Sequence, residues 1–348
     1  MRKYYFDKNK AVAIFFCFVF CFFSANFWGV KNAPVPSPSV LEKRVQELKD
    51  LRWGMFICWS FSTFSGREWT GGVAKRTDYD NLFPAKNVDT DQWARTAKEA
   101  GMGYILFLSK HHDGFCLWDT KTTERKVTNA PLGRDVLAEL RKSCDKYGIK
   151  LALYFSEGDW TWEGAVDGEH MEGGSNPEMK KAQLKELLTQ YGDIEYIWFD
   201  HAAGTGGLGH DETTAWCKEL QPDCFIGYNH GDQASADIRL GEMGQPGQLD
   251  SVEDSAPYMG QVKKHKWKLA EFTYPILPEH EGGAMWFYSL PEHDGLVHPA
   301  SKLLDDYRGA AEYGNIFSIN IGPDYEGRIR AVDVETLREV GHCISPAP

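Results

Sequence analysis

The sequence predicts an α/β fold built as one (β/α)8 barrel of the TIM type. From about residue 41 onward, short apolar runs alternate with amphipathic stretches, and no linker interrupts the series. The chain has 348 residues, which is enough for one large barrel. A doubly wound sheet is the alternative, but no glycine-rich phosphate loop follows the first expected strand.

Each expected strand is a short apolar run bounded by glycine or polar residues, which is typical of a buried parallel strand. The clearest case is the run 196–199, which begins after polar residues and stops at the carboxylate of Asp200. One more short strand is expected near Ile238, inside the long loops of 229–266. The other expected strands span 54–59, 104–108, 149–155, 224–228, 267–272, 284–288 and 316–321.

Amphipathic stretches between these runs predict the helices. Asp89 can cap one helix, Pro177 occupies the first turn of another, and Gly148 provides a C-terminal stop. The expected helices span 41–51, 89–100, 134–147, 177–191, 212–220 and 301–313.

The N-terminus has the pattern of an export signal. Basic residues precede the apolar run 11–23, which is too short for a comfortable membrane span. Small residues at 24–25 suit cleavage, so we expect a signal peptide at 1–25 and a secreted or periplasmic protein. An uncleaved anchor is the alternative, because residues 27–28 extend the apolar character.

A Pro/Ser-rich stretch separates this signal from the periodic part of the chain. It is expected to be a linker that cannot start a regular element. The expected division is therefore a signal peptide at 1–25, a linker at 26–40 and a catalytic barrel at 41–345.

Composition narrows the classes of partner. Lys and Arg total 38 against 50 Asp and Glu, so the net charge is −12, which argues against binding nucleic acid. The chain has 12 Trp, which serve either a core or the stacking surfaces of a sugar site. No cysteines form a CxxC pair, which argues against a zinc knuckle, whereas Cys217 and Cys224 could form a disulfide.

Polar side chains follow the expected strands, and a barrel brings all of these strand ends onto one face. Asp200 is either a catalytic carboxylate in this position or an ordinary cap of a loop or helix. His111 and His112 are either site residues, exposed loop residues or a metal pair. We expect no metal, because neighbouring strand positions point in opposite directions and no third ligand has a suitable spacing. The polar set is Glu68, Trp69, His111, His112, residues 154–157, Asp200, Asn229, His230 and Glu271.

Two carboxylates with histidine and aromatic neighbours suit glycoside hydrolysis. One carboxylate attacks the anomeric carbon, and the other protonates the leaving oxygen and later activates water. The histidines and tryptophans would hold the hydroxyl groups and one face of the sugar. This chemistry requires no cofactor and no metal.

Several motifs, in order along the chain, resemble the α-L-fucosidases of glycoside hydrolase family 29. The resemblance spans about residues 45–340, and its specificity comes from the ordered set rather than from any single motif. The motifs are RWGMFICW at 52–59, REW at 67–69, KHHDGF at 110–115, LW at 117–118, WFD at 198–200 and NIGPDYEGRI at 320–329.

The resemblance implies a retaining exo-fucosidase with Asp200 as the nucleophile. It implies Glu271 as the acid/base, because a subgroup of the family places a Glu before a Trp-Phe-Tyr strand, here 286–288. Residues 275–283 lengthen that spacing, so Glu242 and Glu281 are the alternatives. The implied sugar contacts are Glu68, Trp69, His111, His112, Tyr154 and Trp198, with Arg239 and Trp286 as further candidates.

Two departures from the family pattern are visible. Cys58 stands where family members usually carry a His that binds a sugar hydroxyl, so the exact sugar stays open. The sequence stops at Pro348, soon after the barrel, so we expect no C-terminal β-sandwich.

The sequence therefore favours an exo-glycosidase acting on terminal α-L-fucosides or a close relative. The alternatives are a non-catalytic carbohydrate-binding barrel and a metal-dependent hydrolase. The expected partner is an oligosaccharide or glycan substrate, with no nucleic acid and no stable membrane partner. Linkage, aglycone and oligomeric state stay open.

Overall fold

The computed structural model describes residues 38–166, 172–230, 235–243 and 267–344. They all belong to a compact unit that spans Ala33–Pro348. The expected signal peptide lies outside the described residues, and so does the linker up to residue 37. Within the described ranges, no helix has the length and apolar character to cross a membrane.

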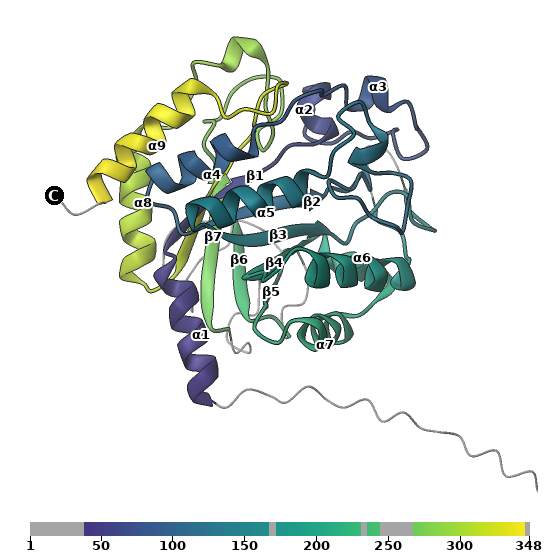
Figure 1. Cartoon of the computed structure of the whole chain (residues 1–348), viewed down its shortest axis with the longest axis horizontal. Coiled ribbons are helices and arrows are strands. Elements are labelled where there is room, and N and C mark those ends of the chain that lie inside the picture. The colour runs from purple at the N-terminus through teal and green to yellow at the C-terminus, as the bar shows by residue number, and fades with distance from the viewer. Residues whose placement is uncertain (1–37, 167–171, 231–234, 244–266, 345–348) are drawn as a thin grey trace, which may run out of the picture. The chain divides into compact units, whose positions relative to one another are not determined.

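Eight parallel strands close into a barrel in the order β1 to β8 (Figure 1). The ring is completed by β1 and β8, where Met55 pairs with Ile319. This confirms the predicted (β/α)8 class. The strands are β1 Trp53–Ile57, β2 Tyr104–Lys110, β3 Lys150–Ser156, β4 Tyr196–Asp200, β5 Phe225–Tyr228, β6 Ile238–Glu242, β7 Leu269–Pro275 and β8 Ile316–Ile321.

The strands are buried on both faces because helices cover the barrel outside and side chains fill it inside. Close packing sets some residue identities. In β1, a Cβ added at Gly54 would come within 2.5 Å of the Tyr104 ring in β2. Glycine therefore allows these two strands to pair with a large aromatic side chain between them.

The helices begin and end at recognisable signals. Asp89 and Asp135 each accept a hydrogen bond from a backbone N–H in the first turn of α4 and α5, and Gly148 ends α5 in the left-handed conformation. In Figure 1, α4 and α5 lie side by side on the outside of the barrel. The helices are α1 Pro38–Asp50, α2 Phe61–Ser65, α3 Tyr79–Leu82, α4 Thr90–Glu99, α5 Val136–Tyr147, α6 Pro177–Gln190, α7 His210–Leu220, α8 Ala300–Glu312 and α9 Ala331–Ile344, with 3-10 turns at Val127–Asn129, Ala202–Gly207 and Pro291–His293.

Two expected elements differ from the structure. The segment 284–288 is not a strand, because β7 pairs directly with β8 and leaves no position between them. Helix α1 begins at Pro38, inside the expected linker, because proline is tolerated in the first turn of a helix. Cys217 and Cys224 are both buried and free, so the structure contains no disulfide between them.

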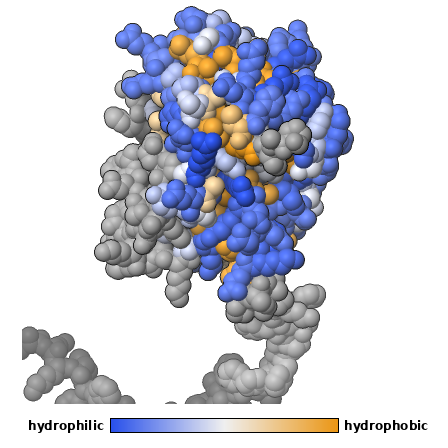
Figure 2. Space-filling view, turned by 90° about the vertical axis from the view of Figure 1, so that its left-hand side faces the viewer, coloured by the Kyte–Doolittle hydropathy of each residue, from blue (hydrophilic) through white to orange (hydrophobic). Residues whose placement is uncertain are grey.

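Hydrophilic residues dominate the face shown in Figure 2, and hydrophobic residues form patches between them. The largest exposed apolar side chain among the described residues is Trp69, which is 53% exposed.

Candidate active site

A cavity lies at the C-terminal ends of the barrel strands, where (β/α)8 barrels carry their sites. Its lining combines carboxylates, imidazoles and aromatic rings. The lining residues are Phe56, Cys58, Glu68, Trp69, Leu108, His111, His112, Tyr154, Trp198, Asp200, His201, His230, Glu242, Trp286 and Phe287.

Asp200 is the last residue of β4, and both of its carboxylate oxygens are held by hydrogen bonds. The Tyr154 hydroxyl donates to Oδ2 at 2.7 Å. The Asn229 side-chain amide and the His201 backbone N–H each donate to Oδ1 at 2.9 Å. These bonds fix the direction of the carboxylate. Asp200 is 8% exposed and lines the cavity.

Imidazole rings surround this carboxylate. His112 Nε2 lies 3.6 Å from Oδ2, and His230 Nδ1 lies 3.6 Å from Oδ1. Burial alone would raise the pKa of Asp200, but its ion pair with His230 and the nearby His201 hold that pKa well below its ordinary value. Asp200 is therefore ionised, which is the state that a nucleophile requires.

Glu242 brings a second carboxylate to the cavity from the end of β6. Its Oε2 lies 3.1 Å from His230 Nε2 and accepts a hydrogen bond from Asn229 at 2.7 Å. Burial lowers the pKa of His230, but its bonds to Asp200 and Glu242 outweigh burial and raise that pKa to about 10. His230 is thus a positively charged imidazolium between the side chains of Asp200 and Glu242.

The separation of the two carboxylates decides what they can do. Single ligand atoms of Asp200, His230 and Glu242 all lie within 4.8 Å of one another. Retaining glycosidases hold their two carboxyl groups roughly 5–5.5 Å apart, and inverting enzymes about 6.5–9.5 Å apart. The observed pair fits the retaining geometry.

Asp200, His230 and Glu242 lie close enough together to bind a metal ion. Within the described ranges, His111 and His112 belong to no group of potential metal ligands. Both histidines line the cavity, with ring centroids 4.0 Å apart. The expectation that they point in opposite directions is wrong, because β2 ends at Lys110 and a turn closes from Gly114 N–H to the His111 carbonyl. Burial lowers the pKa of His111 to about 3, so this ring is neutral.

Aromatic rings form the floor and walls. Trp198 stacks on Tyr154 with centroids 5.5 Å apart, and Phe56 contacts both Trp198 and Trp286 at 6.0 Å. Trp69 is the exposed ring at the rim. Such surfaces suit the apolar face of a sugar ring.

Glu68 holds one wall in place. Its Oε2 accepts hydrogen bonds from the backbone N–H groups of Met285 at 2.8 Å and Trp286 at 3.1 Å. These N–H groups therefore bond to a side chain rather than to a neighbouring strand. Burial raises the pKa of Glu68 to about 7 despite these two bonds.

The profile of the Alpha-L-fucosidase family matches residues 34–345 of this chain. The chain belongs to this family. The resemblance noted in the sequence is thereby confirmed.

Two members of the family show how much is shared. Alpha-L-fucosidase 1 of Arabidopsis thaliana is 29% identical over 327 residues, which are 88% of this chain and 59% of that protein. The chain thus spans only part of that relative's length. The solved structure of alpha-L-fucosidase isoenzyme 1 from Paenibacillus thiaminolyticus superposes with a TM-score of 0.72 at 26% identity, covering 87% of this chain and 76% of that one.

In this family member, two of the expected site residues do not line the cavity. In the register of β6 and β7, Glu271 lies level with Leu240, two residues before Glu242 and therefore about 6.6 Å further from the cavity along the strand. Its Oε2 accepts a hydrogen bond from the Trp198 indole at 3.2 Å, and burial raises its pKa to about 7. Arg239 is also buried at depth, with its guanidinium 5.6 Å from the Trp267 ring.

This placement does not support Glu271 as the acid/base, because a general acid must reach the glycosidic oxygen inside the cavity. Of the two alternatives, Glu242 lines the cavity, whereas Glu281 is exposed in the segment after β7 and does not. The cavity does bring together the other expected residues: Glu68, Trp69, His111, His112, Tyr154, Trp198, Asp200 and Trp286.

His201 is a site residue that was not expected from the sequence, and His230 was expected at the strand ends without a role. His201 directly follows Asp200 and has a left-handed backbone, with φ of 51°. This conformation is uncommon for a residue other than glycine and occurs at functional sites. Its position next to the nucleophile candidate was the available sequence signal, but its backbone angle was not readable from the sequence.

Proposed function

We propose that this chain hydrolyses terminal α-L-fucosides, or glycosides of a closely related sugar, with retention of configuration. The main support is the pair Asp200 and Glu242, whose carboxyl groups face one cavity at a separation that suits double displacement. Membership of the Alpha-L-fucosidase family selects the sugar class. The glycan substrate would enter past Trp69 at the rim.

In the first step, Asp200 would attack the anomeric carbon and form a covalent glycosyl ester. The Tyr154 hydroxyl and the Asn229 amide orient the attacking carboxylate. The developing positive charge on the sugar ring would form beside the stacked Trp198 and Tyr154 rings.

Glu242 would act as the acid/base. In its protonated form it would give its proton to the leaving oxygen. As the resulting carboxylate it would then take a proton from the water that cleaves the ester, which restores the protonated form. The free anomeric hydroxyl and the restored Asp200 carboxylate end the cycle. No step in this sequence needs a metal or an organic cofactor.

The test is turnover of aryl α-L-fucosides, with the anomer of the first product followed by NMR. We expect retention of configuration, and a drop in kcat of several orders of magnitude for a folded Asp200→Asn variant. Normal turnover by that variant would exclude the proposed nucleophile. Binding of fucose without turnover by the wild type would favour a carbohydrate-binding barrel.

A chelator separates this proposal from a metal-dependent hydrolase. We expect full activity after dialysis against EDTA, because Asp200 and Glu242 already receive hydrogen bonds from Asn229. Activity that disappears on dialysis and returns with one equivalent of a divalent metal would overturn this expectation.

We also propose that the protein is exported, on the strength of the charged and apolar pattern of residues 1–25. N-terminal sequencing of protein recovered from culture medium or periplasm tests this. A mature N-terminus near residue 26 supports export, and an intact Met1 in the cytoplasmic fraction contradicts it.

A further inference from the structure

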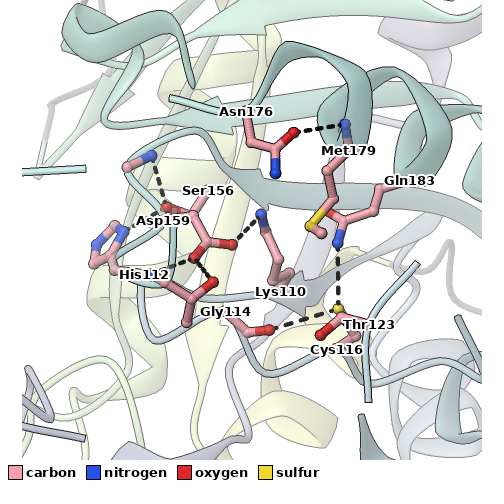
Figure 3. Close-up of polar contacts among 12 residues, drawn as sticks. Lys110, His112, Gly114, Cys116, Thr123, Ser156, Asp159, Asn176, Met179 and Gln183 are labelled. Atoms are coloured by element: carbon pink, nitrogen blue, oxygen red, sulfur yellow. Dashed lines mark hydrogen bonds and ion pairs between the residues drawn. The ribbon is translucent and has the colours of Figure 1, made fainter. Parts of the chain in front are cut away.

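Ser156 lies beside the proposed nucleophile but has no part in the mechanism above. It is the last residue of β3, level with Asp200 in the register of β3 and β4. Its Oγ lies 2.6 Å from His112 Nδ1, and both side chains are buried (Figure 3). This contact places a hydroxyl directly behind an imidazole of the active site.

The direction of this hydrogen bond follows from the other partner of Ser156. The backbone N–H of Gly158 donates to Oγ at 3.1 Å, so the oxygen already accepts one bond. The hydroxyl hydrogen is then available for His112 Nδ1. If Nδ1 instead carried the hydrogen, the hydroxyl would be left without an acceptor in a buried position, at a cost of about 1–3 kcal/mol.

The second ring nitrogen of His112 faces the reaction. Burial lowers the pKa of His112 well below its ordinary value, so the ring is neutral and carries one hydrogen. When Nδ1 accepts from Ser156, that hydrogen sits on Nε2, which lies 3.6 Å from Asp200 Oδ2. The opposite tautomer would direct a lone pair toward this carboxylate.

The loop after β3 is itself held firmly. Lys110 and Asp159 form a buried ion pair at 2.7 Å (Figure 3). The Trp160 N–H donates to the His112 carbonyl at 2.8 Å. A Cβ on Gly158 would come within 2.7 Å of the His201 side chain, so glycine is needed there. The N–H that orients Ser156 therefore has little freedom to move.

We propose that Ser156 is a positioning residue that fixes His112 as the Nε2–H tautomer, so that an N–H group faces Asp200 and the bound sugar. Its effect on turnover rests on the proposed fucosidase activity. Its effect on the tautomer does not.

The kinetic test is a double-mutant cycle. Ser156→Ala should lower kcat/KM about 10- to 100-fold, by analogy with the loss seen when the orienting partner of a metal-bound histidine is removed. In a His112→Gln background, the same change should cost less than about twofold, because there is no imidazole left to orient. An equal loss in both backgrounds would overturn the proposal.

Ser143→Ala is the matched control, because Ser143 is a buried serine whose hydroxyl bonds to Thr90 away from the cavity. It should leave kcat/KM within about twofold of the wild type. A loss comparable to that of Ser156→Ala would show that any buried serine has this effect, and would count against the proposal.

The spectroscopic test does not depend on activity. In ¹⁵N-histidine NMR of the wild type, the signals absent from His112→Gln belong to His112. We expect a protonated Nε2 and an unprotonated Nδ1. A protonated Nδ1 would refute the proposal even in an active fucosidase, whereas the expected tautomer in a protein without fucosidase activity would sink only the proposed function.

Discussion

At the scale of single residues, Glu242 and Glu271 carry the same carboxyl group, but Glu242 lines the cavity and Glu271 lies below it in the barrel. Glu242→Ala should slow substrates with poor leaving groups far more than aryl fucosides with good ones, and azide should rescue the latter, because only the step that needs an acid is impaired. Glu271→Ala should affect both substrate types equally and show no rescue, since Glu271 bonds to the Trp198 indole below the cavity. Steady-state kinetics with a series of leaving groups measures both effects.

Glu281→Gln is the control for this series, because Glu281 is exposed and does not line the cavity. Its kinetics should match those of the wild type. Azide rescue of Glu271→Ala, without rescue of Glu242→Ala, would return the acid/base role to Glu271.

His230 offers a second prediction at this scale, on pH dependence. Its ion pair with Asp200 helps to keep the pKa of that carboxylate low. Removing this cation in His230→Gln should raise the pKa of Asp200, because the ionised form loses stabilisation. The acid limb of the pH profile of kcat/KM should therefore move to higher pH.

The profile is measured from pH 3 to 9, with His342→Gln as the control, because His342 is an exposed residue of α9. That variant should keep the wild-type profile. An acid limb that stays in place, or moves to lower pH, in His230→Gln would contradict the assigned role of His230.

At the scale of elements, close packing between β1 and β2 depends on Gly54. Gly54→Ala should destabilise the fold by about 1–3 kcal/mol, because the added methyl group meets the buried Tyr104 ring. The ring cannot easily move away, since its hydroxyl bonds to Ser318 at 2.8 Å. Urea denaturation followed by tryptophan fluorescence measures the free energy of unfolding.

Gly295→Ala is the matched control, because a Cβ at Gly295 meets no atom within 4 Å. Its free energy of unfolding should lie within about 0.5 kcal/mol of the wild type. Equal effects at both positions would contradict the packing argument.

The same scale shows which elements the sequence predicts well. Apolar runs at 104–108, 224–228 and 316–321 became strands because each is buried on both faces and has a neighbour on each side. The run 284–288 is also apolar, but its backbone binds the distant Glu68 carboxylate. That partner is a tertiary contact, so no local pattern could have revealed it.

At the scale of the whole molecule, barrel closure gathers residues that are far apart in the chain. Glu68, His112, Asp200 and Trp286 share one cavity because each lies at or after the C-terminal end of a different strand. Strand order therefore predicted much of the site. Depth along a strand was not predictable, because it depends on the register of β6 and β7, and this is why Glu271 and Arg239 were expected at the cavity.

The buried Glu271 also makes the stability of the whole fold depend on pH. Burial raises its pKa from the ordinary 4.5 to about 7, so between these values the folded state binds more protons than the unfolded state. Stability must then fall as the pH rises from about 4.5 through 7, and stay lower above that. Glutamine mimics the neutral form of this side chain. Glu271→Gln should therefore raise the free energy of unfolding at pH 8 by up to about 3 kcal/mol, and with it the melting temperature. At pH 4.5 both quantities should stay almost unchanged. Calorimetry at both pH values measures these melting temperatures. Glu281→Gln is the control and should change neither of them. A Glu271→Gln variant that is less stable than the wild type at pH 8 would show that the ionised carboxylate stabilises the barrel interior.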